Sequence, residues 1–221
     1  MVDAHPSWYH RFEIFPGITT PGVYDPSGTL SMLKLPDRMD GRSVLEIGPA
    51  DGYFTKAMHD RGASITTLDY ASSLSGFSIT QKLSELDVNK VDSNIFDVDK
   101  HGFEPFDHVI MLGILYHLPD LVRPFWLLRP LIKGELIIET VVSRKFDDLA
   151  YAEYTQGATP NGDMTNFWAP SPKCVEGILL DCGYLITETW LNGERGMFRA
   201  VVNDTPKSES KVEFAYSFVE P

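Results

Sequence analysis

One apolar run that ends in an acid and passes into a glycine-bearing turn constrains this sequence most. It reads Val44-Leu45-Glu46-Ile47-Gly48-Pro49-Ala50-Asp51-Gly52-Tyr53-Phe54-Thr55. The pattern predicts a buried strand, a turn and a helix. A second apolar run begins at Ser64 and ends in another acid, Asp69. Parallel strands that end in acids, with a helix between them, can hold a nucleoside at the sheet edge, where the second acid accepts from ribose hydroxyls.

The glycines of this turn do not have the spacing of a dinucleotide-binding loop. The G-x-G-x-x-G pattern lets a pyrophosphate approach a helix N-terminus closely. Counted from Gly48, the second and third glycine positions are Ala50 and Tyr53, and Gly52 follows Gly48 by four residues. The pattern Glu-x-Gly-x-x-x-Gly therefore disfavours a dehydrogenase. A plain strand, turn and helix without a ligand is the alternative at this point.

Composition excludes several classes of protein. The chain has 221 residues, 43% of them apolar, and a net charge of −12. This length suits one full-cored domain, and the acidic surface disfavours binding to nucleic-acid phosphates. No run approaches the 18 apolar residues of a membrane span, and the first residues lack the pattern of a signal peptide, so we expect a cytoplasmic protein without membrane contact. Cys174 and Cys182 are too few for a zinc site, and no metal is expected.

The order of the expected elements predicts an α/β protein. Strands are expected at residues 43–47, 64–69, 90–96, 106–112, 135–142, 185–191 and 197–202, and helices at 53–61, 74–86, 121–131 and 172–182. Alternating strands and helices followed by a terminal hairpin predict a Rossmann-like, seven-stranded, mostly parallel sheet with one antiparallel strand and helices on both faces.

The remaining segments give the expected domain organisation. Residues 1–40 are expected to form an arm or short helix packed on the core, and residues 41–203 form the main domain. Within it, residues 143–171 interrupt the alternation and predict a substrate lid with a helical piece near Phe146–Tyr154; a surface loop with its own aromatic cluster is the alternative. The tail, residues 204–221, alternates apolar and polar residues from Val212 to Val219. It predicts an edge strand or a segment that reaches a second subunit in a homodimer.

Several motifs resemble one enzyme family. The pattern Glu-x-Gly-x-x-x-Gly resembles the first motif of class I S-adenosylmethionine (SAM)-dependent methyltransferases, with Ala50 at the usual middle glycine. The run from Met111 to Asp120 resembles the LYHLPDP run of a group related to the tRNA wobble-uridine methyl- and carboxymethyltransferases. Further similar segments are Trp8–Arg11, Gly17–Gly22, Phe167–Ser171 and Arg199–Val201. The resemblance extends from about residue 8 to residue 202.

The resemblance implies SAM as the cofactor and a set of residues that bind it. An acid in the region of Asp97 often accepts from the adenine amino group in this class, and the next backbone N–H, of Val98, meets a ring nitrogen; Asp99 or a plain surface acid is the alternative. The implied cofactor-binding residues are Glu46, Gly48, Pro49, Ala50, Asp51, Gly52, Tyr53, Asp69, Tyr70, Asp97, Val98, Leu112 and Gly113.

Methyl transfer from a sulfonium needs an aligned acceptor and, for O–H or N–H acceptors, a base. His117 is the first candidate base because the ordinary pKa of histidine, near 6.5, suits work near neutral pH. Tyr116 is a candidate for positioning the acceptor or the cofactor, and His10 is a second candidate base if the arm folds over the site. Helix capping by His117 and packing by Tyr116 are the alternatives.

The aromatic arm and insertion predict the walls of an acceptor pocket. Candidate substrate-binding residues are Trp8, Tyr9, Tyr151, Tyr154, Phe167, Trp168 and Arg199. In the wobble-uridine enzymes a C-terminal arginine pairs with the extra carboxylate of carboxy-SAM, and Arg199 resembles it; a salt bridge at the sheet edge is the alternative, and we favour ordinary SAM.

The expected function is methyl transfer, O-methylation first, to a small aromatic or apolar metabolite. Transfer to a tRNA wobble uridine is one alternative, which the net charge of −12 disfavours. The other alternative is a SAM-binding domain without catalysis.

Overall fold

The structure is a computed structural model that describes residues 2, 7–70, 75–157, 163–203 and 211–216. The chain divides into two compact units, residues 1–95 and 96–221, and each is described by itself.

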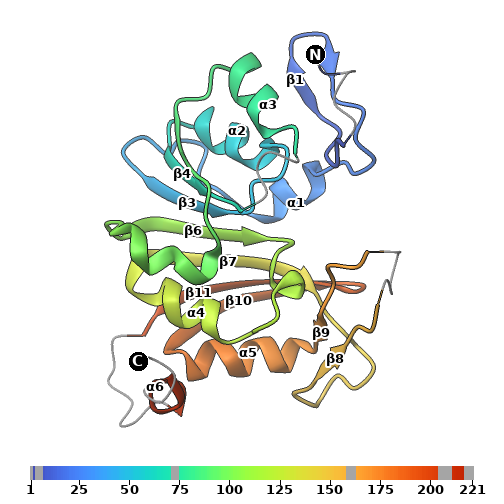
Figure 1. The fold of residues 1–221 in the computed structure, drawn as a ribbon, viewed down its shortest axis with the longest axis vertical. Coiled ribbons are helices and arrows are strands. Elements are labelled where there is room, and N and C mark those ends of the chain that lie inside the picture. Colours follow the sequence, from blue (N-terminus) through green and yellow to red (C-terminus); the bar gives the residue numbers. More distant parts are fainter. Residues whose placement is uncertain (1, 3–6, 71–74, 158–162, 204–210, 217–221) are drawn as a thin grey trace. The chain divides into compact units, whose positions relative to one another are not determined.

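The first unit is built on three parallel strands, β3 (Ser43–Ile47), β4 (Ser64–Leu68) and β5 (Val88–Val91). Ile47 pairs with Leu68, and Leu68 pairs with Val91, so the carboxyl ends of the three strands are level. Two helices accompany them (Figure 1): α2 (Tyr53–His59) lies against β4, and α3 (Phe77–Leu83) lies beside α2. The apolar residues of β3 and β4 are buried and form the core of this unit.

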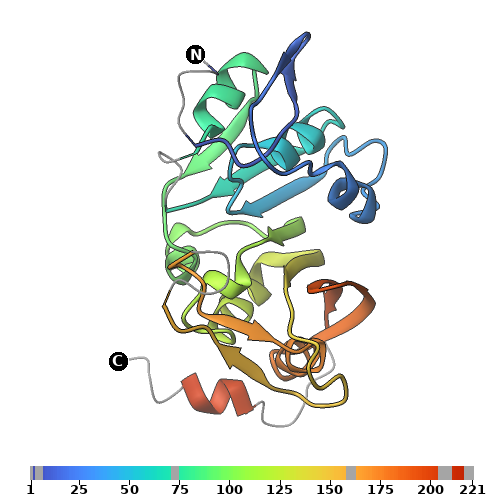
Figure 2. The ribbon, with the colours of Figure 1, turned by 90° about the vertical axis from the view of Figure 1, so that its right-hand side faces the viewer.

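The arm folds on this unit as a hairpin and a short helix. β1 (Glu13–Phe15) pairs antiparallel with β2 (Ile18–Thr19), and α1 (Ser27–Met32) follows. Both views place β1 beside α3 (Figures 1 and 2). Trp8, Phe12 and Ile14 are buried in one hydrophobic cluster, against which Tyr53 of α2 packs. The arm is therefore bound by burial of its aromatic residues.

The second unit holds the strands β6 (Phe106–Leu112), β7 (Ile132–Val141), β10 (Tyr184–Asn192) and β11 (Arg195–Val202). β6 is parallel to β7, and β11 is antiparallel to both β7 and β10. Its helical segments are η2 (Ile95–His101), η3 (Leu115–His117), α4 (Arg123–Leu128), η4 (Arg129–Leu131), α5 (Pro172–Asp181) and α6 (Lys211–Tyr216).

The strand order confirms the expected fold class. The seven strands run in the order β10-β11-β7-β6-β3-β4-β5, with β11 as the antiparallel one. The nearly continuous apolar sequence of β7 is buried from Leu136 to Thr140, as expected for a central strand. Among the described residues, no helix combines the length and the apolar character needed to cross a bilayer.

Three local predictions are wrong. β5 ends at Val91, so Asp97 and Val98 lie in η2 and not at a strand end. The insertion has no helix near Phe146–Tyr154; its strands β8 (Ala152–Tyr154) and β9 (Trp168–Pro170) pair antiparallel, as Figure 2 shows. Alternating aromatic and small residues suit such a ribbon better than a helix.

The third correction concerns the tail, where a helix replaces the expected strand. In α6, Val212 is buried and the Tyr216 hydroxyl donates to Asp120 Oδ2 at 3.3 Å. These residues are four apart and so share one face of a helix. The Tyr216 ring also lies 6.3 Å from that of Trp126. Residues 217–219, the rest of the predicted strand, lie outside the described residues.

Candidate functional site

The first unit brings the predicted cofactor residues of the glycine loop, defined here as residues 48–52, to the carboxyl edge of the sheet. Gly48 follows β3 and Asp69 follows β4, its neighbour in the sheet. The Gly48 N–H donates to the Leu68 carbonyl at 2.9 Å, and the Asp69 N–H donates to the Val91 carbonyl at 3.1 Å. These bonds extend the strand ladder by one residue and fix the loop and Asp69 side by side.

The glycine loop turns through three residues with positive φ. The angles are +68° at Gly48, +49° at Ala50 and +84° at Gly52. A glycine adopts this region without strain, whereas an alanine pays about 1 kcal/mol. A Cβ at Gly52 would also lie 3.1 Å from the Phe77 ring. The substitution of the usual middle glycine by Ala50 therefore keeps the loop conformation at an energetic cost.

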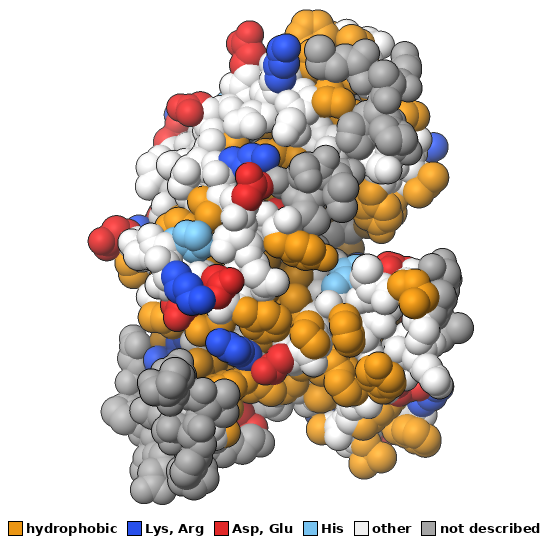
Figure 3. All heavy atoms as spheres, in the orientation of Figure 1, with side chains coloured by type: hydrophobic (Ala, Val, Ile, Leu, Met, Phe, Trp, Pro, Cys, Tyr) orange, Lys and Arg blue, Asp and Glu red, His pale blue; other side chains and the backbone are white. Residues whose placement is uncertain are grey.

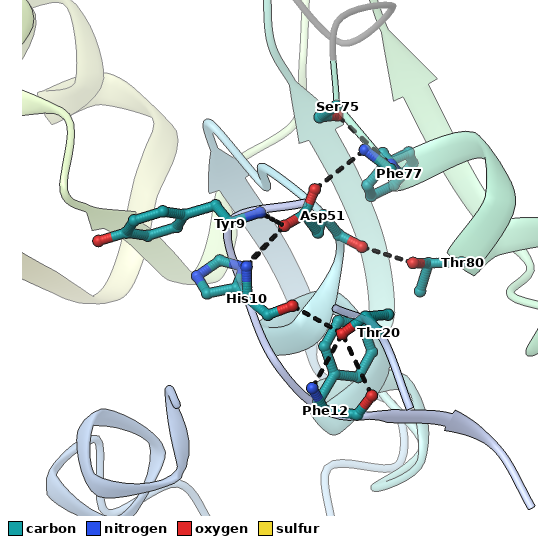
Figure 4. A network of polar contacts seen from close by, with 9 residues as sticks. Tyr9, His10, Phe12, Thr20, Asp51, Ser75, Phe77 and Thr80 are labelled. Carbon is teal, nitrogen blue, oxygen red and sulfur yellow. Dashed lines mark hydrogen bonds and ion pairs between the residues drawn. The ribbon is translucent and has the colours of Figure 1, made fainter. Parts of the chain in front are cut away.

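The carboxylate of Asp51 is the centre of a buried hydrogen-bond network (Figure 4). The backbone N–H groups of Tyr9 and His10 donate to its Oδ2 at 2.7 and 2.8 Å, and the Gly76 N–H donates to Oδ1 at 2.9 Å. The Thr80 hydroxyl donates to the Asp51 carbonyl at 2.6 Å. Asp51 is 1% exposed. This predicted cofactor residue thus joins the arm, the glycine loop and the start of α3.

His10 and Trp8 are anchored in the same region. Burial lowers the pKa of His10 to about 4, so its imidazole is neutral at pH 7. Its Nδ1 lies 3.8 Å from Asp51 Oδ2 and has no hydrogen-bond partner among the described residues. The Trp8 indole N–H donates to the Val2 carbonyl at 3.0 Å, and its ring would lie 2.3 Å from a Cβ at Gly76. Tyr9, by contrast, is half exposed and stacks on Tyr24.

Glu46, the acid within β3, is buried beneath the loop. It accepts from the Thr55 hydroxyl at 2.5 Å. Burial raises the pKa of Glu46 to about 7, and the bond from Thr55 opposes that rise.

This raised pKa gives a testable pH dependence of stability. Because folded Glu46 binds its proton more tightly than unfolded glutamate, its contribution is intact below about pH 4.5 and is lost as pH rises toward 7. Glu46→Gln cannot titrate and does not show this loss. The free energy of unfolding of Glu46→Gln minus that of the native protein should therefore increase by roughly 3 kcal/mol between pH 4 and pH 8. Urea unfolding across this range measures the difference. Thr55→Val removes the hydrogen bond that opposes the rise of the Glu46 pKa, so this variant should lose more stability between pH 4 and pH 8 than the native protein does. A difference between Glu46→Gln and the native protein that stays constant with pH would contradict the argument.

The other predicted cofactor residues occupy varied environments. Tyr53 packs its ring on Phe12 at 5.3 Å, and Tyr70 is 75% exposed. In η2, the Asp97 carboxylate accepts from Lys100 at 2.5 Å, a bond that lowers its pKa, while Val98 is fully buried. Val98 thus faces the core of its unit and Asp97 faces solvent.

In the second unit, Tyr116 and His117 follow the carboxyl end of β6. Gly113 turns the chain after Leu112 with φ +69° and donates to the Glu139 carbonyl at 2.8 Å. The next turn, η3, carries Tyr116 and His117, whose rings are 4.1 Å apart. His117 is partly buried, and burial lowers its pKa.

The insertion returns to this turn through three contacts. The Phe167 N–H donates to the Tyr116 carbonyl at 2.9 Å, and the Trp168 indole N–H donates to the Pro119 carbonyl at 3.1 Å. The Thr165 hydroxyl lies 2.9 Å from His117 Nδ1. The structure therefore brings the predicted residues His117, Phe167 and Trp168 together.

Two further predicted residues lie in the insertion ribbon. The Tyr154 ring packs on Trp168 at 5.3 Å and is 64% exposed. The Tyr151 hydroxyl bonds Ser143 Oγ at 2.8 Å. Exposed apolar side chains mark this region, and Figure 3 shows hydrophobic side chains gathered over β8 and β9. The exposed large residues here are Phe146, Leu149, Tyr154 and Met164.

An arginine that the sequence analysis did not select lies at the sheet edge. Arg195 pairs with Val141, the last residue of β7, and its guanidinium makes a two-point contact with Glu139, with Nη2 2.5 Å from Oε2. It also lies over the Tyr116 ring at 5.3 Å. Arg199 lies four residues further along β11. Its Nη1 forms an ion pair with Glu135 Oε2 at 3.1 Å, and its Nε forms one with Glu188 Oε2 at 3.8 Å. The feature of the sequence that could have pointed to Arg195 is Glu139, an acid inside the apolar run of β7.

A protein-family model described as a methyltransferase domain matches residues 28–184, about seven-tenths of the chain. This chain belongs to the methyltransferase domain family. The match confirms the resemblance at the level of the family, whereas the wobble-uridine group remains a prediction. The matched segment contains the glycine loop, β4 and the turn at η3.

Two relatives agree with this membership. The ubiquinone biosynthesis O-methyltransferase of Coxiella burnetii is 29% identical over 142 residues, 60% of this chain and 60% of the relative. That of Stutzerimonas stutzeri is 27% identical over 141 residues, 59% of this chain and 60% of the relative. The chain thus spans about three-fifths of the length of these methyltransferases.

Two solved structures share the fold. The N-terminal domain of EvdMO1, solved in the presence of S-adenosylhomocysteine (SAH) and D-fucose, has a TM-score of 0.65 at 19% identity, covering 91% of this chain and 93% of that one. The 1,6-didemethyltoxoflavin-N1-methyltransferase of Burkholderia thailandensis, with bound 1,6-didemethyltoxoflavin and SAH, has a TM-score of 0.58 at 16% identity, covering 81% and 77%. These similarities confirm the fold.

Proposed function

We propose that this chain transfers the methyl group of SAM to a hydroxyl group of a small aromatic or apolar metabolite. Family membership supports methyl transfer. One observation, a partly buried His117 with a lowered pKa at the carboxyl end of β6, supports an acceptor that must lose a proton, and among such acceptors we choose a hydroxyl. The relatives named O-methyltransferases support the same choice.

The glycine loop suits a nucleoside without phosphate groups. Its residues, like the strand before it, carry no lysine or arginine, and its glycine spacing differs from that of pyrophosphate-binding loops. Asp69, fixed beside the loop by the backbone bonds of β4 and β5, is the proposed acceptor for the ribose hydroxyls. Three similar structures, among them DhpI, were solved with SAH.

The chemistry divides between the cofactor and the chain. SAM supplies an electrophilic methyl group on a sulfonium sulfur. His117 takes the proton of the acceptor hydroxyl, so that the oxygen gains nucleophilic character as the new C–O bond forms. Tyr116, whose ring is flanked by Arg195 and His117, positions the acceptor. The apolar side chains of the insertion exclude water, which would compete as a methyl acceptor.

Incubation with ¹³C-methyl SAM tests the reaction directly. Phenols, catechols and aliphatic alcohols serve as probe acceptors, and mass spectrometry together with NMR identifies the atom that carries the label. A labelled methoxy group on a hydroxylated aromatic probe is the expected product. Label on nitrogen or sulfur with no methoxy product would contradict the assignment of oxygen.

Asp69 provides a test of the cofactor site that needs no acceptor. Asp69→Ala should weaken SAH binding by roughly 1–3 kcal/mol, because the ribose hydroxyls lose a charged hydrogen-bond acceptor. Isothermal titration calorimetry measures the change. Asp60→Ala, which removes an exposed carboxylate at the end of α2 in the same unit, is the matched control and should leave the affinity unchanged. Equal affinities of Asp69→Ala and the native protein would remove Asp69 from the site.

Transfer to a tRNA wobble uridine is a second candidate, favoured by the resemblance of the run from Met111 to Asp120. The net charge of −12 opposes it, because tRNA binding depends on lysine and arginine contacts to phosphates. Binding of tRNA measured against salt concentration distinguishes the two. Tight binding that weakens steeply with salt would favour the tRNA.

A further inference from the structure

A short hydrogen-bond chain runs from His117 through Thr165 to Asp163. His117 Nδ1 lies 2.9 Å from Thr165 Oγ1 and 3.3 Å from the Thr165 carbonyl oxygen. Thr165 Oγ1 in turn lies 2.6 Å from Asp163 Oδ1, which also accepts the Thr165 backbone N–H at 2.8 Å. These contacts involve Nδ1 alone, and no hydrogen bond from the described part of the chain engages the other ring nitrogen, Nε2.

The donors and acceptors available in this hydrogen-bond chain determine which atom carries each proton. The hydrogen bond from the Thr165 hydroxyl lowers the pKa of Asp163, so its carboxylate is ionised near neutral pH and can only accept. The single hydroxyl proton of Thr165 is therefore donated to Asp163, and Oγ1 must accept from His117. The Thr165 carbonyl, which also can only accept, imposes the same requirement independently. Both partners need a proton on Nδ1.

We propose that Asp163 and Thr165 are positioning residues, which hold neutral His117 with its proton on Nδ1 and leave the lone pair on Nε2 to receive the proton of the acceptor hydroxyl. The inference rests on the proposed function for its catalytic meaning. In the step, the acceptor oxygen forms a bond to the methyl carbon with its own electron pair while the carbon–sulfur bond breaks and its electrons return to sulfur. The hydroxyl proton passes to Nε2, and the resulting imidazolium keeps its Nδ1–H bond to Thr165.

The surrounding charges fit this role. Burial lowers the pKa of His117 most, and the charge of Arg195 lowers it further, whereas the Thr165 carbonyl and Asp163 raise it. Arg195 is itself paired with the carboxylate of Glu139 of β7. The Tyr116 ring lies beside the His117 imidazole. The β9 segment that returns over the turn contributes Trp168, Ala169 and Pro170, none of which is ionisable. The imidazole is thus neutral at rest, and Asp163 stabilises the cation that forms during the step.

The tautomer can be measured without any acceptor. Long-range ¹H–¹⁵N correlation NMR above the pKa of His117 shows which ring nitrogen carries hydrogen, and His117→Gln assigns the signal among the six histidines of the chain. The native protein and Thr165→Ser, which keeps the hydroxyl, should show the proton on Nδ1. Thr165→Val keeps the shape and the backbone carbonyl but removes the hydroxyl, so Nδ1–H loses the shorter of its two contacts and the population should shift part of the way toward the proton on Nε2. Asp163→Asn should keep the tautomer and lower the pKa of His117, because the imidazolium loses a nearby negative charge.

Kinetics then link the tautomer to catalysis. With ¹³C-methyl SAM and catechol as the probe acceptor, Thr165→Val should lower kcat by the same factor by which the population of the competent tautomer falls, with the Kd of SAH unchanged and Thr165→Ser restoring the rate. In Asp163→Asn the rise of kcat/KM with pH should move to lower pH.

The outcomes separate the two proposals. A native His117 with its proton on Nε2, or an unchanged tautomer in Thr165→Val, would overturn the positioning role. So would full activity in Thr165→Val once its tautomer has shifted. Absence of methyl transfer from the native protein to every probe, with the tautomers as expected, would overturn the proposed function and leave the hydrogen-bond chain in place.

Discussion

Asp51→Ala is expected to unfold at a markedly lower urea concentration than the native protein. Three backbone N–H groups lose their acceptor in this variant, the buried ones of His10 and Gly76 and the partly buried one of Tyr9. Each unsatisfied buried donor costs about 1–3 kcal/mol, so we expect a loss of roughly 3 kcal/mol or more in the free energy of unfolding. The same variant should release the arm, which hydrogen exchange detects as faster exchange at Tyr9 and His10.

Two variants calibrate this prediction. Asp51→Asn keeps the shape and one acceptor oxygen, so its loss should be intermediate, with the amide group facing a donor. Asp60→Ala removes an exposed carboxylate that pairs with Lys56, and surface pairs of this kind contribute about 1 kcal/mol or less. If Asp51→Ala were as stable as Asp60→Ala, Asp51 would not be the anchor of the arm.

His117→Gln should abolish most of the methyl transfer to a hydroxyl acceptor. A positioned base contributes about 10²–10⁴-fold to the rate, and glutamine keeps a polar side chain but cannot accept the proton. The Kd of SAH should stay the same. With a phenol as the acceptor, the difference between variant and native rates should shrink toward pH 10, near the ordinary pKa of a phenol, because a phenolate needs no base.

The control is the same substitution at His101, an exposed histidine in η2. His101→Gln should keep the native rate and pH profile. A His117→Gln protein with the native kcat at pH 7 would show that the acceptor reacts without this base. A deficit that stays constant up to pH 10 would assign His117 to positioning.

The main sheet was predictable because its strands carry strong local signals. The strand at Ser43–Ile47 was predicted with its observed bounds, and β6, β7, β10 and β11 were placed within a few residues. Apolar runs that end in acids or glycines report burial directly. The segment after Val91 and the tail were misassigned because short apolar runs fit both a strand and a helix.

The site was predictable only where a residue lies next to a strong motif. Asp69 and His117 follow apolar strands, and the sequence analysis selects them as candidates on that basis. The role of Asp51 depends on partners 25 to 42 residues away, Tyr9, His10 and Gly76, which no local pattern reveals. Arg195 reaches the sheet edge because a two-residue turn after Asn192 sets the register of β11. Neighbouring Arg199 has the same chemistry but lies in the strand interior.

Calorimetric titration of SAH into the native protein tests the central claim most directly, because binding of the demethylated cofactor requires neither an acceptor nor turnover. One site per chain, weakened in Asp69→Ala and unaffected in His117→Gln, is the predicted result. No detectable binding of SAH or SAM to a protein shown by circular dichroism to be folded would contradict the claim.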